Sequence, residues 1–265
     1  MQSNDEVLST LPRDGRLVGR TVWVTGSTSG IGEATAHVLA ASGATVVVSG
    51  RDGARAEAVA TAITDAGGTA ATLVADLAAP PEQLRATAAR AVDLLGGRLD
   101  VLVANAGVYP VSATEALPDA DLEAMLAVNV RAPHVLVGAL APAMAERGDG
   151  VVVGIGSWMA RVGSPFGAMY TATKAALEQL VRSWSAEYGP RGVRVNTVAP
   201  GATATPGNAD AAAVLEAMTA STVAGRPVRP VDVAFAVRWL VSDEAAFVHG
   251  TTLDVDGGMT ATRLG

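Results

Sequence analysis

The sequence contains no cysteine, and this absence excludes disulfide bonds, thiolate metal ligands and a cysteine nucleophile. Histidine is also scarce: His37, His134 and His249 lie far apart in the sequence, and none has another histidine nearby. We therefore predict no metal site. Long apolar runs are missing too, since no uninterrupted stretch reaches the ~18 residues of a membrane-spanning helix. We expect no association with a membrane.

Basic residues are in the minority, with 19 against 26 acidic residues and a net charge of −7. A nucleic-acid-binding face needs a basic stripe, so we predict no nucleic-acid partner. Hydrophobic residues make up 49% of the chain, which is enough to bury a sizeable core. Residues 1–15 are polar, include Asp5 and Glu6, and lack the features of a signal peptide. We expect a flexible N-terminal arm over residues 1–17 and a cytoplasmic protein.

Lysine occurs once, as Lys174, and the other 18 basic residues are arginine. An ammonium is compact and carries three rotatable donors, which a guanidinium cannot imitate. Tyr170 is four residues earlier, so on a helix the two side chains share one face. A nearby cation lowers the pKa of a phenol from about 10, which suits acid–base work at an alcohol or ketone oxygen. A chance pair on a surface helix is the alternative at this point.

Short valine-rich segments alternate with helical patterns along the chain, which is typical of a parallel sheet covered on both faces. We predict strands at 21–25, 44–49, 69–75, 100–104, 150–155, 193–198 and 252–255. Helices are predicted at 31–42, 54–66, 81–95, 119–147 (bent near Pro133), 168–188, 209–222 and 230–242. The pattern predicts an α/β protein with a Rossmann-like, doubly wound parallel sheet of about seven strands, in a single domain over residues 18–265.

A glycine-rich turn separates the first strand from the first helix. It reads Thr25-Gly26-Ser27-Thr28-Ser29-Gly30-Ile31-Gly32. Glycines allow a close backbone approach, and a helix N-terminus offers free N–H groups to a pyrophosphate. The turn is not a P-loop, because Glu33 follows Gly32 where a P-loop has lysine. This context predicts a dinucleotide cofactor.

The spacing Thr-Gly-x-x-x-Gly-x-Gly resembles the short-chain dehydrogenase/reductase family, and further motifs agree in order over residues 18–260. Asn105-Ala106-Gly107 resembles the family's Asn-Asn-Ala-Gly, except that Ala104 replaces the first asparagine. The other matching positions are Asp76-Leu77 on the adenine side, Asn129, Ser157, Tyr170 and Lys174 as the catalytic tetrad, Pro200-Gly201 with Thr203 and Thr205 on the nicotinamide side, and Asp256-Gly257-Gly258 near the C-terminus.

The resemblance implies a role for each tetrad residue. Tyr170 would protonate the carbonyl oxygen as hydride arrives, and Lys174 would lower the pKa of Tyr170 and hold the nicotinamide ribose. Ser157 would hydrogen-bond the substrate oxygen, although a strand-end hydroxyl can also satisfy a backbone group. Asn129 would fix a water that links Lys174 to solvent, or be a helix-kink residue. The resemblance also implies a homotetramer or homodimer.

The end of the second strand decides between the two nicotinamide cofactors, because an acid there binds the ribose of NAD and an arginine the 2′-phosphate of NADP. The family's acidic position falls on Gly50, and Arg51 follows it. We therefore favour NADP(H). NAD(H) is the alternative, through Asp52, which we expect instead to cap the helix that begins near Gly53.

The substrate pocket is the variable part of the family. Candidate residues share an apolar or aromatic character and follow predicted strands: Val108, Tyr109, Trp158, Met159 and Phe166, together with Ser157 and the loop 202–225. They favour a mid-sized, largely apolar ketone or secondary alcohol. One alternative is a 3-oxoacyl-[acyl-carrier-protein] reductase, which needs a basic entrance that Arg147 and Arg191 would supply. Another is a nicotinamide-sensing regulator without turnover.

Overall fold

A computed structural model describes residues 3–165 and 167–262. Its centre is a seven-stranded sheet in the order β3-β2-β1-β4-β5-β6-β7, in which every pairing is parallel. The strands are β1 (Thr21–Val24), β2 (Thr45–Gly50), β3 (Thr69–Val74), β4 (Val101–Ala104), β5 (Gly150–Ile155), β6 (Val193–Pro200) and β7 (Thr252–Val255). This order confirms the predicted doubly wound fold.

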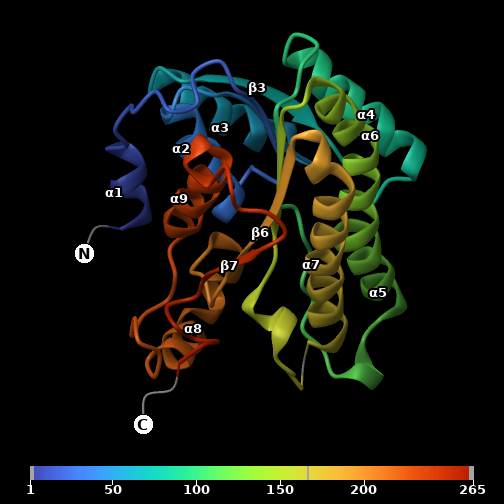
Figure 1. The fold of residues 1–265 in the computed structure, drawn as a ribbon. Coiled ribbons are helices and arrows are strands. Elements are labelled where there is room, and N and C mark those ends of the chain that lie inside the picture. Colours follow the sequence, from blue (N-terminus) through green and yellow to red (C-terminus); the bar gives the residue numbers. More distant parts are fainter. Residues whose placement is uncertain (1–2, 166, 263–265) are drawn as a thin grey trace.

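Helices cover both faces of the sheet (Figure 1). One face packs against α2 (Gly30–Ala41), α3 (Gly53–Asp65) and α9 (Pro230–Val241). The other packs against α4 (Pro81–Leu94), α6 (Ala132–Arg147) and α7 (Ala168–Tyr188). Strand alternation separates the two cores, since Trp23 of β1 joins the α4–α6–α7 side while Val22 and Val24 join the other. The smaller helices are α1 (Asn4–Ser9), α5 (Asp119–Met125), α8 (Ala212–Thr219) and the single turns Thr114–Ala116, Gly189–Arg191 and Asp243–Ala245.

The strand order has a switch point between β1 and β4. Chain connections leave these two neighbouring strands in opposite directions, so a crevice opens beyond their carboxyl ends, where ligands bind in such sheets. Two short helical segments, η3 (Trp158–Arg161) and η5 (Pro206–Ala211), follow β5 and β6 at the same edge. The predicted glycine-rich turn and tetrad therefore come together at one edge of the sheet.

The helical stretch Asp119–Arg147 is continuous but irregular. A π-helical segment, η2 (Leu126–Arg131), joins α5 to α6, so the irregularity precedes Pro133, near which we predicted a bend. By length and composition this stretch is apolar enough to cross a membrane. However, 56% of its most apolar window is buried in the structure, and α6 contributes core residues such as Leu136 and Met144. Packing in the helical layer accounts for its apolar character.

The N-terminal segment that we expected to be a flexible arm is folded from residue 3 onward. Val7, Leu8 and Leu11 pack against a small cluster formed by α2 and α9. Asn4 Oδ1 accepts a 2.9 Å hydrogen bond from the Val231 N–H in the first turn of α9, where backbone donors lack helical partners. Leu17, the last residue assigned to the arm, is only 1% exposed and belongs to the core.

Candidate active site

The glycine-rich turn packs so closely that side chains would not fit. A Cβ on Gly32 would lie 2.3 Å from the Gly26 carbonyl oxygen and 2.4 Å from Asn105 Nδ2. A Cβ on Gly26 would lie 2.9 Å from the Ala106 Cα. Ser29 begins α2 without a side-chain cap, so its hydroxyl does not occupy the N–H groups of the first turn. The turn therefore has the form of a cradle for an anionic group at a helix N-terminus.

Hydrogen bonds hold the turn to the end of β4. Asn105 Nδ2 donates to the carbonyl oxygens of Thr25 (2.8 Å) and Gly26 (2.9 Å), and Thr25 Oγ1 accepts from the N–H groups of Asn105 (3.0 Å) and Ala106 (3.1 Å). Ser27 is different, because its hydroxyl donates to the Val24 carbonyl at 2.7 Å and its N–H to β2. Ser27 thus supports the turn from inside, while Thr28, Ser29 and Ile31 are partly exposed.

At the end of β2, Asp52 caps α3 as expected, accepting from the N–H groups of Ala54 (3.0 Å) and Arg55 (3.1 Å). Arg51 is exposed beside it. A second guanidinium, which we did not predict, stands at the same place: Arg55 Nη2 donates to the Thr28 carbonyl at 3.3 Å. The signal was in the sequence, because Arg55 lies four residues after Arg51, in the first turn of the helix predicted at 54–66.

Asp76, which the resemblance assigns to the adenine side, is exposed and accepts from the Ala78 N–H at 2.9 Å, whereas the Leu77 side chain is buried. Arg131, from the π-helical segment, donates to the carbonyl oxygens of Ala78 (2.6 Å) and Ala79 (3.2 Å). The loop after β3 is therefore held by a side chain from the segment that joins α5 to α6.

The residues that the resemblance assigns to the nicotinamide side follow β6. A Cβ on Gly201 would lie 2.7 Å from the Asp256 Cα, so the C-terminal loop packs directly on this glycine. Thr203 donates to the Gly201 carbonyl at 2.9 Å. Asn208 then spans the loop, donating to the Thr203 carbonyl and accepting from the Thr205 N–H, each at 2.8 Å. Pro200, Gly201, Thr203 and Thr205 all line the same cavity as Ser157, Tyr170 and Lys174.

The four tetrad residues lie together. Ser157, Tyr170 and Lys174 line one cavity, with Ser157 Oγ also accepting from the Met159 N–H at 3.2 Å. Asn129 lies behind them in the π-helical segment. Its Oδ1 accepts from the Val108 N–H and its Nδ2 donates to the Val108 carbonyl, both at 2.9 Å. Asn129 therefore holds the backbone that follows β4, and is more than an irregular point in a helix.

The protonation of the pair differs from our expectation. Burial raises the pKa of Tyr170, a hydrogen bond with the Ser157 hydroxyl lowers it, and Tyr109 raises it further. Lys174 Nζ donates instead to the Ile155 carbonyl at 2.7 Å and lies 5.8 Å from the Tyr170 ring centroid. Burial lowers the pKa of Lys174 to about 8. In this arrangement burial has the largest effect on the pKa of Tyr170, and the Lys174 ammonium faces a carbonyl.

The cavity has a volume of about 520 Å³. Lys174 is the one charged side chain among the described residues that line it. Of the predicted pocket residues, Tyr109, Ser157, Trp158 and Met159 line the cavity; Phe166 lies outside the described residues. Val108 is not among the residues that line the cavity, and its backbone N–H and carbonyl hydrogen-bond to the Asn129 side chain. The lining residues that we did not name singly are mostly apolar: Pro110, Val111, Val214, Leu215 and Met218.

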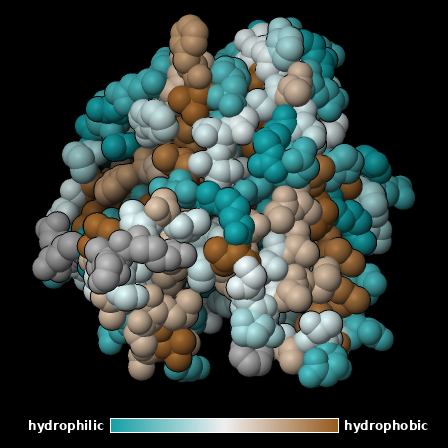
Figure 2. Space-filling model, turned by 60° about the horizontal axis from the view of Figure 1, so that its bottom comes forward, coloured by the Kyte–Doolittle hydropathy of each residue, from teal (hydrophilic) through white to brown (hydrophobic). Residues whose placement is uncertain are grey.

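Tyr109 spans the mouth of this cavity. Its ring meets the Tyr170 ring edge to face, with 6.2 Å between centroids and 65° between planes. A Cβ on Gly207 would lie 2.8 Å from the Tyr109 hydroxyl oxygen, so the ring reaches from the loop after β4 to η5. The Tyr109 side chain is 47% exposed. Figure 2, which brings this end of the molecule forward, shows apolar residues reaching the surface in separate patches among hydrophilic ones.

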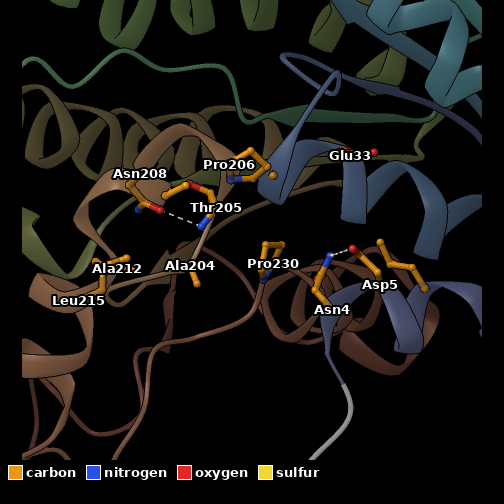
Figure 3. Close-up of a pocket in the computed structure, with 13 residues that line it drawn as sticks. Asn4, Asp5, Glu33, Ala204, Thr205, Pro206, Asn208, Ala212, Leu215 and Pro230 are labelled. Carbon is orange, nitrogen blue, oxygen red and sulfur yellow. Dashed lines mark hydrogen bonds between the residues drawn. The ribbon is translucent and has the colours of Figure 1, made fainter.

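A second hollow, of about 380 Å³, lies behind the segment that follows β6. Figure 3 shows Thr205 and Asn208 on one side of it and Asn4 and Asp5 of α1 on the other. Burial raises the pKa of Glu33 on its rim, and Asp5 adds to this effect. Thr205, Asn208 and Leu215 line both hollows, so this segment is a shared wall.

The two arginines that we offered as a basic entrance lie elsewhere. Arg147, the last residue of α6, donates to the Leu99 carbonyl at 2.7 Å, just before β4 begins. Arg191 stacks on the ring of Tyr188, with 4.9 Å to the ring centroid, at the end of α7 remote from Tyr170. Both sit at the amino edge of the sheet, opposite the cavity. The expectation of a basic entrance built from these residues is therefore wrong.

Comparison with known proteins agrees with this geometry. Residues 26–260 match a family described as enoyl-(acyl carrier protein) reductase. The 3β-hydroxysteroid dehydrogenase 1 of Eggerthella lenta is 38% identical over 251 residues, covering 92% of this chain and 95% of the relative. L-rhamnose 1-dehydrogenase (NAD(P)(+)) of Sphingomonas sp. is 37% identical over 249 residues, covering 92% and 97%. Among solved structures, a short-chain dehydrogenase from Burkholderia cenocepacia in complex with NADP superimposes with a TM-score of 0.82 at 36% identity, covering 93% of this chain and all of that one.

The two sequence relatives are named for different alcohols, and all three proteins match this chain over almost their whole length. The matched region contains the glycine-rich turn, the tetrad and the loop after β6. The chain belongs to the short-chain dehydrogenase/reductase family and is an oxidoreductase that acts on CH–OH and C=O groups.

Proposed function

We propose that this protein transfers a hydride between NADP(H) and a neutral, largely apolar ketone or secondary alcohol, with Tyr170 as the general acid/base. The observation that carries the proposal is the meeting of Ser157, Tyr170 and Lys174 in an apolar cavity at the carboxyl edge of the sheet. The nicotinamide supplies the hydride when it is bound. The chain supplies the proton, the orientation and the exclusion of water.

Reduction needs a phenol that still carries its proton. A phenol, whose ordinary pKa is about 10, carries its proton at neutral pH, and burial raises the pKa of Tyr170 further, so the hydroxyl can donate to a substrate oxygen. The Ser157 hydroxyl interacts with Tyr170, so the same two groups can converge on one oxygen atom and stabilise its developing charge. A substrate oxygen placed between them receives two hydrogen bonds.

Lys174 would help to hold the cofactor next to Tyr170 and Ser157. One of its three donors is used on the Ile155 carbonyl, which leaves two for ribose hydroxyls. The glycine cradle fits a pyrophosphate, because side chains at Gly26 or Gly32 would collide with the surrounding backbone. Asp76, Leu77, Asn105, Ala106 and Gly107 would border the adenosine and central part of the cofactor.

The preference for NADP(H) rests on the end of β2. The Asp52 carboxylate is engaged by two N–H groups of α3, which opposes its use on the ribose of NAD(H). Arg51 and Arg55 put two guanidinium groups at the same turn, and guanidinium pairs well with phosphate. The Burkholderia cenocepacia relative that was solved with NADP is consistent with this preference.

The residues that line the cavity indicate the class of substrate. A carboxylate substrate would need a cation beyond Lys174, and the described lining residues offer none. Apolar side chains, from Pro110 and Val111 on one side and Val214, Leu215 and Met218 on the other, favour a hydrocarbon body. We therefore propose alicyclic or aryl ketones, and the matching secondary alcohols, as substrates.

The proposal is tested by following NADPH oxidation with a panel of ketones that differ in charge and size. We expect turnover with neutral apolar ketones and none with keto acids. Tyr170→Phe, which loses only the phenol oxygen, is the control for chemistry. If NADPH binds but no carbonyl compound is turned over, the proposal is wrong.

A further inference from the structure

We infer that Thr173 is a positioning residue of the active site, whose buried hydroxyl joins the amide of Asn129 to the backbone of Tyr170. The inference rests on the proposed function, because it assumes that Tyr170 is the acid/base. It concerns a residue for which the family resemblance implied no role, and it follows from two hydrogen bonds.

The hydroxyl of Thr173 has both of its roles assigned. Its Oγ1 donates to the Tyr170 carbonyl at 2.8 Å, three residues back along α7. A hydroxyl carries one hydrogen, so the other contact must use a lone pair. Asn129 Nδ2 donates to that lone pair at 3.1 Å. Thr173 is 1% exposed and Asn129 2%, so bulk solvent does not reach either group.

These contacts determine how the Asn129 amide is turned. Its Nδ2 faces two acceptors, the Val108 carbonyl and Thr173 Oγ1, while Oδ1 faces the Val108 N–H. The reversed amide would set an N–H against the N–H of Val108 and leave the Val108 carbonyl without a donor. Without the Thr173 hydroxyl, one N–H of Asn129 would lose its acceptor in a buried place, which is unfavourable.

The orientation of Asn129 matters because its oxygen borders Lys174. A Cβ on Gly107 would lie 3.4 Å from Asn129 Oδ1 and 3.5 Å from Lys174 Nζ, so the two atoms flank the same small space. Thr173 also holds the carbonyl of the turn that carries the Tyr170 side chain. A single hydroxyl therefore orients the asparagine beside the ammonium and holds the backbone of the catalytic tyrosine.

The central variant is Thr173→Val, which keeps the shape of the side chain and removes the hydroxyl. Thr173→Ser keeps the hydroxyl and removes the methyl group. Thr171→Val is the matched control, since Thr171 makes the same back-bond, to the Ala168 carbonyl at 2.8 Å, but lies about 200° around α7 from Thr173. Kd for NADPH and Tm are measured for each variant alongside kcat and KM.

We expect Thr173→Val to lower kcat by about ten- to a hundredfold, as a misplaced catalytic group does, with Kd for NADPH unchanged within about twofold. Thr173→Ser should restore kcat, and Thr171→Val should leave it unchanged. Wild-type kcat in Thr173→Val, a loss that serine does not rescue, or an equal loss in Thr171→Val would each overturn the inference. If Thr173→Val does not fold, Thr173→Ala compared with Thr173→Ser isolates the hydroxyl in the same way.

The test of Thr173 can fail without the proposed function failing, because different variants test the two. An inactive Tyr170→Phe with a fully active Thr173→Val leaves the proposed function intact and removes only this inference. An active Tyr170→Phe removes the proposed function itself.

Discussion

Lys174 donates a 2.7 Å hydrogen bond to the Ile155 carbonyl, and its ammonium lies 5.8 Å from the centre of the Tyr170 ring. The lysine is thus tied to the end of β5, and the tyrosine pairs with Ser157. Because Lys174 and Tyr170 have different hydrogen-bond partners, we expect their substitutions to have different effects on catalysis and stability.

Tyr170→Phe should abolish turnover while leaving NADPH binding and Tm close to the wild-type values, because only the phenol oxygen is lost. Lys174→Arg should also be severely impaired, since a guanidinium cannot place its donors as an ammonium does. Steady-state kinetics and fluorescence titration with NADPH measure both effects. Near-normal kcat in Tyr170→Phe would refute the acid/base role.

Lys174→Met should be inactive but more stable than the wild type at pH 7. Burial lowers the pKa of this amine from 10.5 to about 8, so the unfolded chain binds more protons than the folded one between about pH 8 and 10.5. Wild-type stability from this group therefore rises with pH across that window, and the penalty is fully present below pH 8. The Tm advantage of Lys174→Met should be largest below pH 8 and shrink toward pH 10. A difference in Tm that is constant from pH 6 to 10 would contradict the assignment.

Arg51→Ala should reduce kcat/KM with NADPH by roughly ten- to a hundredfold, the effect of losing a charge-assisted contact of about 1.5–3 kcal/mol. Arg55→Ala should add a further loss, and NADH use should hardly change in either variant. Arg85→Ala, on the exposed side of α4, is the control for a general loss of positive charge. A wild type that prefers NADH, with both arginine variants neutral, would refute the NADP(H) preference.

An acidic residue at Gly50 is a poorer test than the family pattern suggests. A Cβ there would lie 2.6 Å from Thr28 Cγ2, so Gly50→Asp alone would disturb the glycine-rich turn. The charge reversal is better placed at Arg51, whose side chain is exposed. Arg51→Asp should favour NADH over NADPH, because a carboxylate repels the 2′-phosphate.

Tyr109→Ala should shift substrate preference toward larger ketones by about tenfold in relative kcat/KM, a typical effect of adding space to an apolar pocket. The reason is that the Tyr109 ring covers Tyr170 and reaches η5 across the cavity mouth. Tyr109→Phe keeps the ring and is the matched control. Gly207→Ala should act like a displaced ring, because its methyl group would meet the Tyr109 hydroxyl. Unchanged size preference in both Tyr109→Ala and Gly207→Ala would show that the ring does not limit the pocket.

We propose a homodimer or homotetramer, on the strength of the family resemblance and of the alanines that α6 and α7 leave exposed, such as Ala139, Ala143 and Ala186. Closed twofold symmetry is the default for such assemblies. Light scattering should give a mass that is two or four times the 26.6 kDa of the chain. A stable monomer at micromolar concentration would exclude this assembly.

The alternation of valine-rich strands with helices was enough to predict seven parallel strands, because burial on both faces demands continuous apolar runs. Residue spacing was also enough to predict those parts of the site whose residues lie within a few positions of one another in the sequence. Glycines at Gly26, Gly30 and Gly32 mark a cradle, and a four-residue interval places Tyr170 and Lys174 on one helix face. The cap formed by Asp52 was readable for the same local reason.

Contacts between distant segments were decided only by the tertiary structure. The sequence does not show that Asn129 lies in a π-helical turn facing Val108 and Thr173, nor that the Lys174 ammonium meets the Ile155 carbonyl. It also does not show that burial, rather than the neighbouring ammonium, dominates the pKa of Tyr170. Charge, burial and hydrogen-bond direction depend on which atoms surround a group in space, and 19 to 44 residues of chain separate these partners. The local sequence pattern was enough to predict which residues form this site. The packing of the sheet and helices determines their hydrogen-bond partners, their burial and the direction of their pKa shifts.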